Sequence, residues 1–273
     1  MSIGPLALSS GLLALLFGVI AALATAGFLR RRGYPDVGNP LFLALGLGLL
    51  AARAAYVAGW WSQYVQQPLS MLNIRDHGFD PIAGVLGVII AALVIGWRRP
   101  SLRRPLAAGV VVGIAASAFA GVLACKLTAQ AHPPLPGLVI SDLDGKQVPL
   151  GTLRGQPTVI NLWATWCGPC RREMPVLAEA QHAMPQVRFV FADQGESAAA
   201  VKQFMQAQGI TLDNVLIDGN LQLSHYYNVR GYPTTLFLDS DGRLRDLHMG
   251  ELSRATLAER LQRIHPPASP TPH

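Results

Sequence analysis

The sequence predicts an all-α polytopic membrane region of about four transmembrane helices, followed by an α/β domain. Four apolar runs lie within the first 126 of the 273 residues, and most are long enough to cross a bilayer as helices. Beyond residue 136, short apolar strands alternate with amphipathic helices instead. We therefore expect a membrane region at 1–126, a Pro-rich linker at 127–136, the α/β domain at 137–265 and a disordered tail at 266–273.

The four apolar runs cover residues 3–29, 40–61, 80–97 and 105–125. The third is the shortest, with a helical length of about 26 Å at ~1.5 Å per residue. The first has no basic start and is too long for a cleavable signal peptide, so we expect it to remain as a membrane span.

Charge is distributed unevenly around these runs. Residues 1–126 hold ten Lys and Arg against three acids, whereas the remainder holds twelve against thirteen. The first loop has three Arg, the third has four, and the second has Arg75 alone. The positive-inside rule then places the first and third loops in the cytoplasm and both termini outside. We expect a multi-pass inner-membrane protein with its α/β domain in the periplasm, and no nucleic-acid partner despite the net charge of +6.

The α/β domain divides into short elements at turn and cap residues. The pattern predicts hairpins that turn at Asp144-Gly145 and Asp241-Gly242, and a helix that ends at Gly209. The remaining expected elements are buried strands at 157–163 and 187–193, a helix from Pro169, and a last helix at 252–264.

Two of the three cysteines, Cys167 and Cys170, form a CxxC motif in "WCGPC" after the first buried strand. A CxxC that opens a helix after a strand is the thioredoxin-type arrangement. The helix N-terminus stabilises a thiolate at Cys167, and Cys170 is close enough to resolve its mixed disulfide. A zinc site needs about four ligands, and no His stands at ligand spacing to the pair, so we expect no metal.

A second signal lies downstream in "RGYPTTLFLD", where Pro233 starts a strand to which it cannot donate a hydrogen bond. Residues 134–265, through this motif, "WATWCGPCRREMPVL" and "ADQGESAAAVKQF", resemble the membrane-anchored thioredoxin-like reductases of the TlpA and ResA type. The resemblance implies a thioredoxin fold, a cis proline at Pro233, pairing of the Tyr232 backbone with a bound substrate, and shielding of the thiols by Trp166. It also implies reduction of protein disulfides without a cofactor.

In that family an acid three residues after the second Cys tunes the pair or relays its protons, and this position is Glu173. A first-turn acid favoured by the helix dipole is the alternative interpretation. The buried acid of ordinary thioredoxins corresponds to Asn161, which cannot take a proton. A peroxidase would need Thr at the position of Ala164, which argues against that activity.

The membrane region resembles the first half of prolipoprotein diacylglyceryl transferase. The match is carried by Arg53, Tyr56, Pro68, Leu69, Gly78, Gly84 and Gly87. It departs at Ile82, where that family has His, so we favour a retained scaffold that contacts membrane lipid or a partner over a transferase with an accessory redox domain. Arg53 inside a span is a functional candidate by default, or a structural charge that snorkels or pairs with Asp80.

Cys125 is the third cysteine, and it is either a small apolar residue or a lipidated one, because "VLAC" resembles a lipoprotein signal. It leaves no second dithiol in the membrane region, so a separate transmembrane thiol donor is expected. A passive binding module remains the third interpretation of the α/β domain, and loss of both motif cysteines would then be harmless.

Overall fold

The computed structural model describes residues 10–65, 68–129 and 133–264. They form two units, one helical and one α/β, and each is described by itself. The expected disordered tail at 266–273 and residues 130–132 of the expected linker lie outside the described residues, as does the side chain of Cys125.

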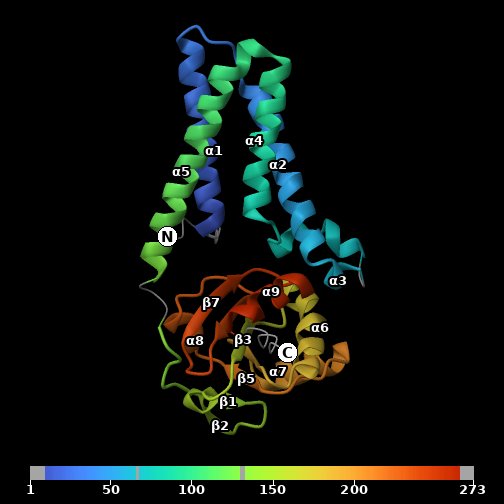
Figure 1. Ribbon diagram of the computed structural model, residues 1–273. Coiled ribbons are helices and arrows are strands. Elements are labelled where there is room, and N and C mark those ends of the chain that lie inside the picture. Colours follow the sequence, from blue (N-terminus) through green and yellow to red (C-terminus); the bar gives the residue numbers. More distant parts are fainter. Residues whose placement is uncertain (1–9, 66–67, 130–132, 265–273) are drawn as a thin grey trace, which may run out of the picture. The chain divides into compact units, whose positions relative to one another are not determined.

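Four long helices make up the helical unit: α1 Ser10–Arg31, α2 Gly38–Gly59, α4 Pro81–Arg98 and α5 Arg103–Ala129 (Figure 1). Short helices connect them: α3 Trp61–Tyr64, η1 Pro68–Leu72, η2 Ile74–Asp76 and η3 Pro100–Leu102. The four long segments are apolar and long enough to cross a membrane, which confirms the predicted membrane region. Apolar side chains such as Ile20, Leu93 and Phe119 are mostly exposed on these helices, as expected of surfaces that face lipid.

Small residues bring the long helices together in pairs, α1 against α5 and α2 against α4. A Cβ at Gly48 of α2 would lie 2.4 Å from Val88 Cγ2 and 2.9 Å from the Gly84 carbonyl oxygen of α4. Only glycine permits that approach of two backbones, which is how membrane helices commonly pack. Two glycines of the transferase resemblance, Gly84 and Gly87, therefore lie in this helix contact.

The α/β unit is built on a seven-stranded sheet in the order β2-β1-β5-β4-β3-β6-β7. The strands are β1 Val139–Asp142, β2 Gln147–Pro149, β3 Thr158–Trp163, β4 Arg188–Gln194, β5 Val215–Asp218, β6 Thr234–Leu238 and β7 Leu244–Met249. Strands β3, β4 and β5 are parallel, whereas β1, β2, β6 and β7 join through antiparallel pairs. The helices are η4 Leu150–Leu153, α6 Gly168–Ala183, α7 Ala198–Gln208, α8 Gln222–Tyr226 and α9 Arg254–Ile264.

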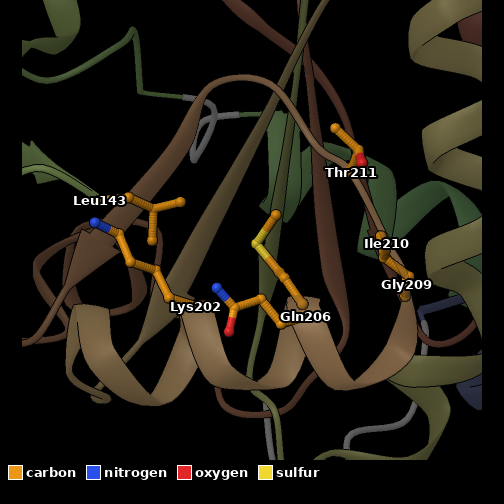
Figure 2. Close-up of a pocket in the computed structure, with 7 residues that line it drawn as sticks. Leu143, Lys202, Gln206, Gly209, Ile210 and Thr211 are labelled. Carbon is orange, nitrogen blue, oxygen red and sulfur yellow. The ribbon is translucent and has the colours of Figure 1, made fainter.

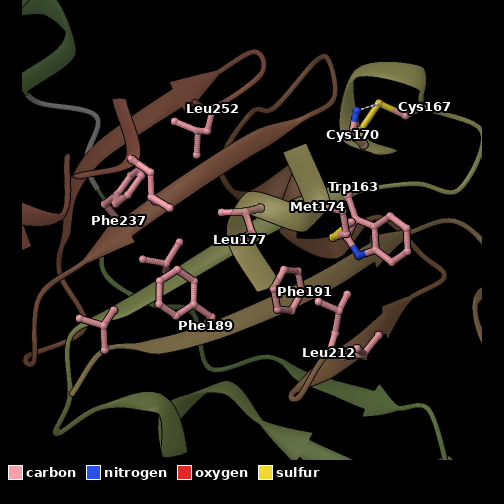
Figure 3. Close-up of a cluster of buried hydrophobic side chains, with 14 of the residues drawn as sticks. Trp163, Cys167, Cys170, Met174, Leu177, Phe189, Phe191, Leu212, Phe237 and Leu252 are labelled. Carbon is pink, nitrogen blue, oxygen red and sulfur yellow. Dashed lines mark hydrogen bonds between the residues drawn. A yellow bond between two sulfur atoms is a disulfide. The ribbon is translucent and has the colours of Figure 1, made fainter. Parts of the chain in front are cut away.

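Both faces of the sheet are covered, so every residue of β3 is buried. Successive side chains of a strand point to opposite faces. Val159 and Trp163 accordingly join one apolar cluster, whereas Ile160 and Leu162 join the other. Figure 3 shows Trp163 in the first cluster together with Phe189, Phe191, Phe237 and Leu177 of α6. This arrangement confirms the predicted α/β domain and places the end of β3 and the start of α6 over a packed core.

Candidate functional site

The CxxC motif lies where β3 ends and α6 begins. Cys167 caps α6, and its sulfur accepts a hydrogen bond from the backbone N–H of Cys170 at 3.2 Å, drawn dashed in Figure 3. Pro169 occupies the first turn, where a helix tolerates a missing N–H. The two cysteines are joined in a disulfide, the oxidised form of the couple.

The local structure favours a thiolate at Cys167 when this disulfide is reduced. A helix N-terminus presents N–H groups that have no intrahelical partner and carries partial positive charge, both of which stabilise an anion. Cys170 is fully buried and Cys167 is 4% exposed, so the sulfur nearer the surface is that of Cys167. The order of attack, Cys167 first and Cys170 second, stays a prediction from the spacing.

Trp166 and Tyr232 lie beside the disulfide. The Trp166 side chain is 69% exposed, and its ring is 6.2 Å from that of Tyr232 in an edge-on arrangement. The Tyr232 side chain is partly buried and packs against the apolar cluster that includes both cysteines. The peptide bond between Tyr232 and Pro233 is cis, and Pro233 directly precedes β6. The residues expected to bind substrate are thus brought together around one exposed aromatic side chain.

Glu173 is buried under the motif, one turn after Cys170 on α6. Its carboxylate accepts hydrogen bonds from Asn161 Nδ2 and from the backbone N–H of Leu252, both at 2.8 Å. Burial raises the pKa of Glu173 to about 8, because these two bonds offset only part of the desolvation of the charged form. The group therefore titrates near neutral pH, where it can hold or release a proton close to the thiols.

An acidic pair, Glu196 and Asp193, holds the segment that precedes Cys167. Glu196 accepts two hydrogen bonds of 2.6 Å from Thr165, one from its backbone N–H and one from its hydroxyl. The backbone N–H of Glu196 donates to Asp193 Oδ1 at 3.1 Å. Burial is the main cause that raises the pKa of Asp193 to about 8, and the hydrogen bond and charge of the neighbouring Glu196 side chain raise it further. The loop after β4 is therefore tied to the loop after β3.

Sequence reasoning missed these Thr165 contacts and the interaction of Asn161 with Glu173. The signal that could have found the first is the polar run "DQGES", which begins at the end of a buried strand and continues past it, since parallel neighbours β3 and β4 end at the same edge of the sheet.

In the helical unit, some of the residues that carry the resemblance to the transferase lie around Arg53. The Arg53 guanidinium donates to three backbone carbonyls, of Met71 at 3.1 Å, Gly78 at 2.7 Å and Ser70 at 3.3 Å. It also lies over the Tyr64 ring. The charge predicted inside the span therefore binds the segment that connects α2 to α4.

Two other residues of this region bear on that contact. A Cβ at Gly78 would lie 2.4 Å from Tyr56 Cε1, so Gly78 packs directly against another residue of the transferase resemblance. Asp80, considered as a partner for Arg53, accepts a hydrogen bond from the Ala83 N–H at 2.8 Å and caps α4.

A pocket lies on a different part of the α/β unit, along α7 and the residues that follow it (Figure 2). Its lining residues are Leu143, Lys202, Met205, Gln206, Gly209, Ile210 and Thr211. None of these belongs to the CxxC site, and Lys202 is paired with Asp144 at 2.8 Å.

Comparisons with known proteins agree with the geometry of both units. Residues 131–247 match the AhpC/TSA family, and residues 1–138 match the prolipoprotein diacylglyceryl transferase family. The thiol-disulfide oxidoreductase ResA of Bacillus anthracis is 32% identical over 150 residues, which cover 54% of this chain and 86% of that protein. The chain belongs to the ResA-type thiol-disulfide oxidoreductases and, over residues 1–138, to the prolipoprotein diacylglyceryl transferase family.

Further relatives are similar to this oxidoreductase to a comparable degree. ResA of Bacillus subtilis (strain 168) is 28% identical over 171 residues, covering 62% of this chain and 95% of that protein. Among solved structures, a thiol:disulfide interchange protein of the thioredoxin family from Chlorobium tepidum is 27% identical with a TM-score of 0.43, covering 49% of this chain and 96% of that one. The fused architecture predicted from the sequence is confirmed by the two family matches.

Proposed function

We propose that this oxidoreductase reduces disulfides of extracytoplasmic proteins by dithiol–disulfide exchange, and that its helical unit anchors it in the membrane. The observation that carries the proposal is the Cys167–Cys170 disulfide at the first turn of α6, beside the exposed ring of Trp166. The names of the ResA relatives support the same chemistry.

The reaction starts from the reduced protein. The Cys167 thiolate attacks one sulfur of the substrate disulfide, the substrate S–S bond breaks, and the departing sulfur takes up a proton. Cys170, deprotonated, then attacks the sulfur of Cys167 in the mixed disulfide and releases the second substrate thiol, which is also protonated. Two electrons and two protons pass to the substrate, and the oxidised protein with its Cys167–Cys170 bond remains.

Glu173 is the candidate for proton transfer at Cys170 in this sequence of steps. Its pKa of about 8 lies close to that of a thiol, so a proton moves between them with little free-energy change. Asn161 cannot serve in this way, and it instead donates to the Glu173 carboxylate. Tyr232 and Pro233 hold the substrate segment, while Trp166 covers the thiols.

The reductive direction rests on the CGPC motif and on the ResA relatives. CGPC is the motif of reducing thioredoxins, whose potential is near about −270 mV, against about −120 mV for a strong oxidant. The oxidised protein must regain two electrons after each turnover. We assign this to a separate transmembrane thiol donor, because Cys125 is the one cysteine outside the motif in the sequence.

The Arg-rich loops at 30–32 and 98–104 support an orientation with the α/β domain outside the cytoplasm. In a Gram-negative cell this corresponds to an inner-membrane protein with a periplasmic thioredoxin-fold domain. The exposed apolar side chains of the long helices would contact membrane lipid.

A trapping experiment tests the chemistry. On a Cys125→Ala background, Cys170→Ser is expected to accumulate a mixed disulfide with a disulfide-bonded substrate, because the resolving thiol is absent, whereas Cys167→Ser forms none. Non-reducing electrophoresis reads both. Equal trapping by the two variants, or reductase activity unaffected by either, contradicts the proposed mechanism.

The direction and orientation are tested in cells. Acid quenching followed by alkylation with a mass-shifting reagent reports the redox state of the pair, and a membrane-impermeant reagent reports its side of the membrane. A mostly reduced, externally labelled pair is expected. A mostly oxidised pair would mean that the protein either donates disulfides or lacks its electron donor. Protection from the impermeant reagent would place the domain in the cytoplasm.

A second candidate is favoured by the match of residues 1–138 to the transferase family, namely a lipid-handling membrane protein with an accessory redox domain. Arg53 binds three carbonyls of its own connecting segment, which fits a structural role better. In one complementation assay we expect Cys167→Ser to abolish function. If Arg53→Ala abolishes function while Cys167→Ser does not, and lipoprotein precursors accumulate, the second candidate is favoured. If the variant that lacks both Cys167 and Cys170 keeps full function, the α/β domain is a passive binding module.

A further inference from the structure

A buried chain of hydrogen bonds runs behind Tyr232. The Tyr232 hydroxyl lies 2.9 Å from Ser224 Oγ, and Ser224 Oγ donates to Gln194 Oε1 at 2.6 Å. Gln194 Nε2 donates in turn to Asp218 Oδ2 at 3.1 Å. Ser224, Gln194 and Asp218 are all at least 96% buried. The chain links α8, the end of β4 and the end of β5 to the residue that precedes Pro233.

The carboxylate of Asp218 determines the direction of this chain. It accepts hydrogen bonds from the backbone N–H groups of Gln222 and Leu223, both at 2.8 Å, so its own position is set by the start of α8. A carboxylate only accepts, and therefore the amide nitrogen of Gln194 faces it and the amide oxygen faces Ser224.

Ser224 has a single hydroxyl hydrogen, and it is used on Gln194. The contact between Ser224 and Tyr232 must then have Tyr232 as the donor. The hydroxyl of Tyr232 is consequently held by Ser224, whose own hydroxyl direction is set through Gln194 by the Asp218 carboxylate. Rotation of the Tyr232 ring would break this partly buried hydrogen bond.

Tyr232 is also the residue whose ring contacts Trp166 edge-on, beside the disulfide. We propose that Ser224, Gln194 and Asp218 are positioning residues for Tyr232, and that through it they set the affinity for an extended polypeptide segment next to the substrate disulfide. This inference rests on the proposed function, and it separates protein disulfides from small disulfides. A small disulfide needs only Cys167, whereas a polypeptide must also lie against the Tyr232–Pro233 backbone and the aromatic pair.

The test uses the full-length chain in detergent, reduced beforehand and freed of reductant, so that each molecule passes its own two electrons to the substrate in a single turnover. Two substrates are compared in excess, a synthetic peptide containing one intramolecular disulfide and the small disulfide 5,5′-dithiobis-(2-nitrobenzoate). KM and kcat are then the half-saturating concentration and the limiting rate of this single turnover. Ser224→Ala and Gln194→Met are expected to raise KM for the peptide about threefold to tenfold with kcat unchanged, the range of one net hydrogen bond. Turnover of the small disulfide should stay as in the wild type. Tyr232→Phe should raise the peptide KM to a similar extent.

A double-mutant comparison separates positioning from a general loss of stability. If Ser224 acts through the Tyr232 hydroxyl, Ser224→Ala has no further effect on the peptide KM in a Tyr232→Phe background. Matched controls are Tyr226→Phe, which removes a hydroxyl that donates to the exposed Pro134 carbonyl at 3.0 Å, and Ser141→Ala, which removes an acceptor of Gln147. Neither control should change KM.

Binding of the same peptide to Cys167→Ala variants, measured by fluorescence anisotropy, gives a readout that needs no turnover. A threefold to tenfold rise in the peptide Kd with Ser224→Ala supports the inference. If the wild type reduces neither substrate, the proposed function is refuted, but this rise in Kd would still support the inference. An unchanged Kd and KM overturns the inference. So does an effect of Ser224→Ala that is the same in the Tyr232→Phe background, or that is equally large for the small disulfide.

Discussion

Glu173→Gln should remove a steep pH dependence of stability from the α/β unit. The native pKa of this buried carboxyl is about 8, against an ordinary value of 4.5. Below pH 4.5 both the folded and the unfolded states are protonated. As the pH rises from there to about 8, the unfolded state has lost the proton and the folded state still holds it, so stability falls by about 1.4 kcal/mol per pH unit. The full difference is about 5 kcal/mol.

Glutamine should fit the site at moderate cost. The amide oxygen of the glutamine can accept from the Leu252 N–H as Glu173 Oε2 does. Asn161 Oδ1 makes no hydrogen bond within the described residues. If the Asn161 amide flips, this oxygen can accept from the amide nitrogen of the glutamine. Thr235, whose hydroxyl accepts from Asn161 Nδ2 at 3.0 Å in the wild type, can then donate its hydroxyl to the same oxygen. The fold is therefore retained while the titrating group is lost.

Hydrogen exchange of the β3 and β4 amides in the oxidised full-length protein measures this effect, with intrinsic exchange rates corrected at each pH. The disulfide keeps both cysteines from titrating. Between about pH 5 and about pH 8, the wild type should lose about 4 kcal/mol more than Glu173→Gln. Asp193 titrates in both proteins, so the difference isolates Glu173. Parallel profiles for the two proteins would refute an elevated pKa at this residue.

Two further predictions concern packing in each unit. Gly78→Ala should destabilise the helical unit by about 1–3 kcal/mol, because its Cβ would lie 2.4 Å from Tyr56 Cε1. Helical circular dichroism in detergent should show a lower melting temperature for this variant. Gly121→Ala should leave the melting temperature unchanged, because no atom of the described residues lies within 4 Å of the added Cβ. Leu177→Ala should cost the α/β unit about 2–5 kcal/mol, since Leu177 is fully buried in the apolar cluster that includes both motif cysteines. Exchange of the β3 amides reads this change, and an effect no larger than that of Val139→Ala, at a 45% exposed site, would contradict it.

Local signals predicted most of the helices and hairpins correctly. Gly145 and Gly242 adopt positive φ in the two predicted hairpin turns, and Gly209 ends α7 in the left-handed conformation. These positions could be read from the sequence because a turn or a helix end needs only its own few residues to satisfy its geometry. The long apolar runs were equally clear, since a membrane span depends on length and composition alone.

Strand β5 and helix α8 were not predicted from the sequence. β5 has four residues, and its strand conformation depends on pairing with β4 on one side and β1 on the other. α8 has five residues and starts from the left-handed Leu221, and its first N–H groups bind the Asp218 carboxylate. Such short elements carry too little pattern to stand out, and long-range contacts decide their structure.

The sequence by itself determined the membrane helices, most of the α/β elements and the CxxC chemistry, because each depends on residues close together in the chain. Only the tertiary structure decided the environment of that chemistry. The carboxyl of Glu173 meets a backbone N–H 79 residues away, and Tyr232 is held through Ser224 by the ends of two strands. Burial and hydrogen bonding between distant segments set a pKa and a side-chain orientation, and neither exists until the sheet has formed.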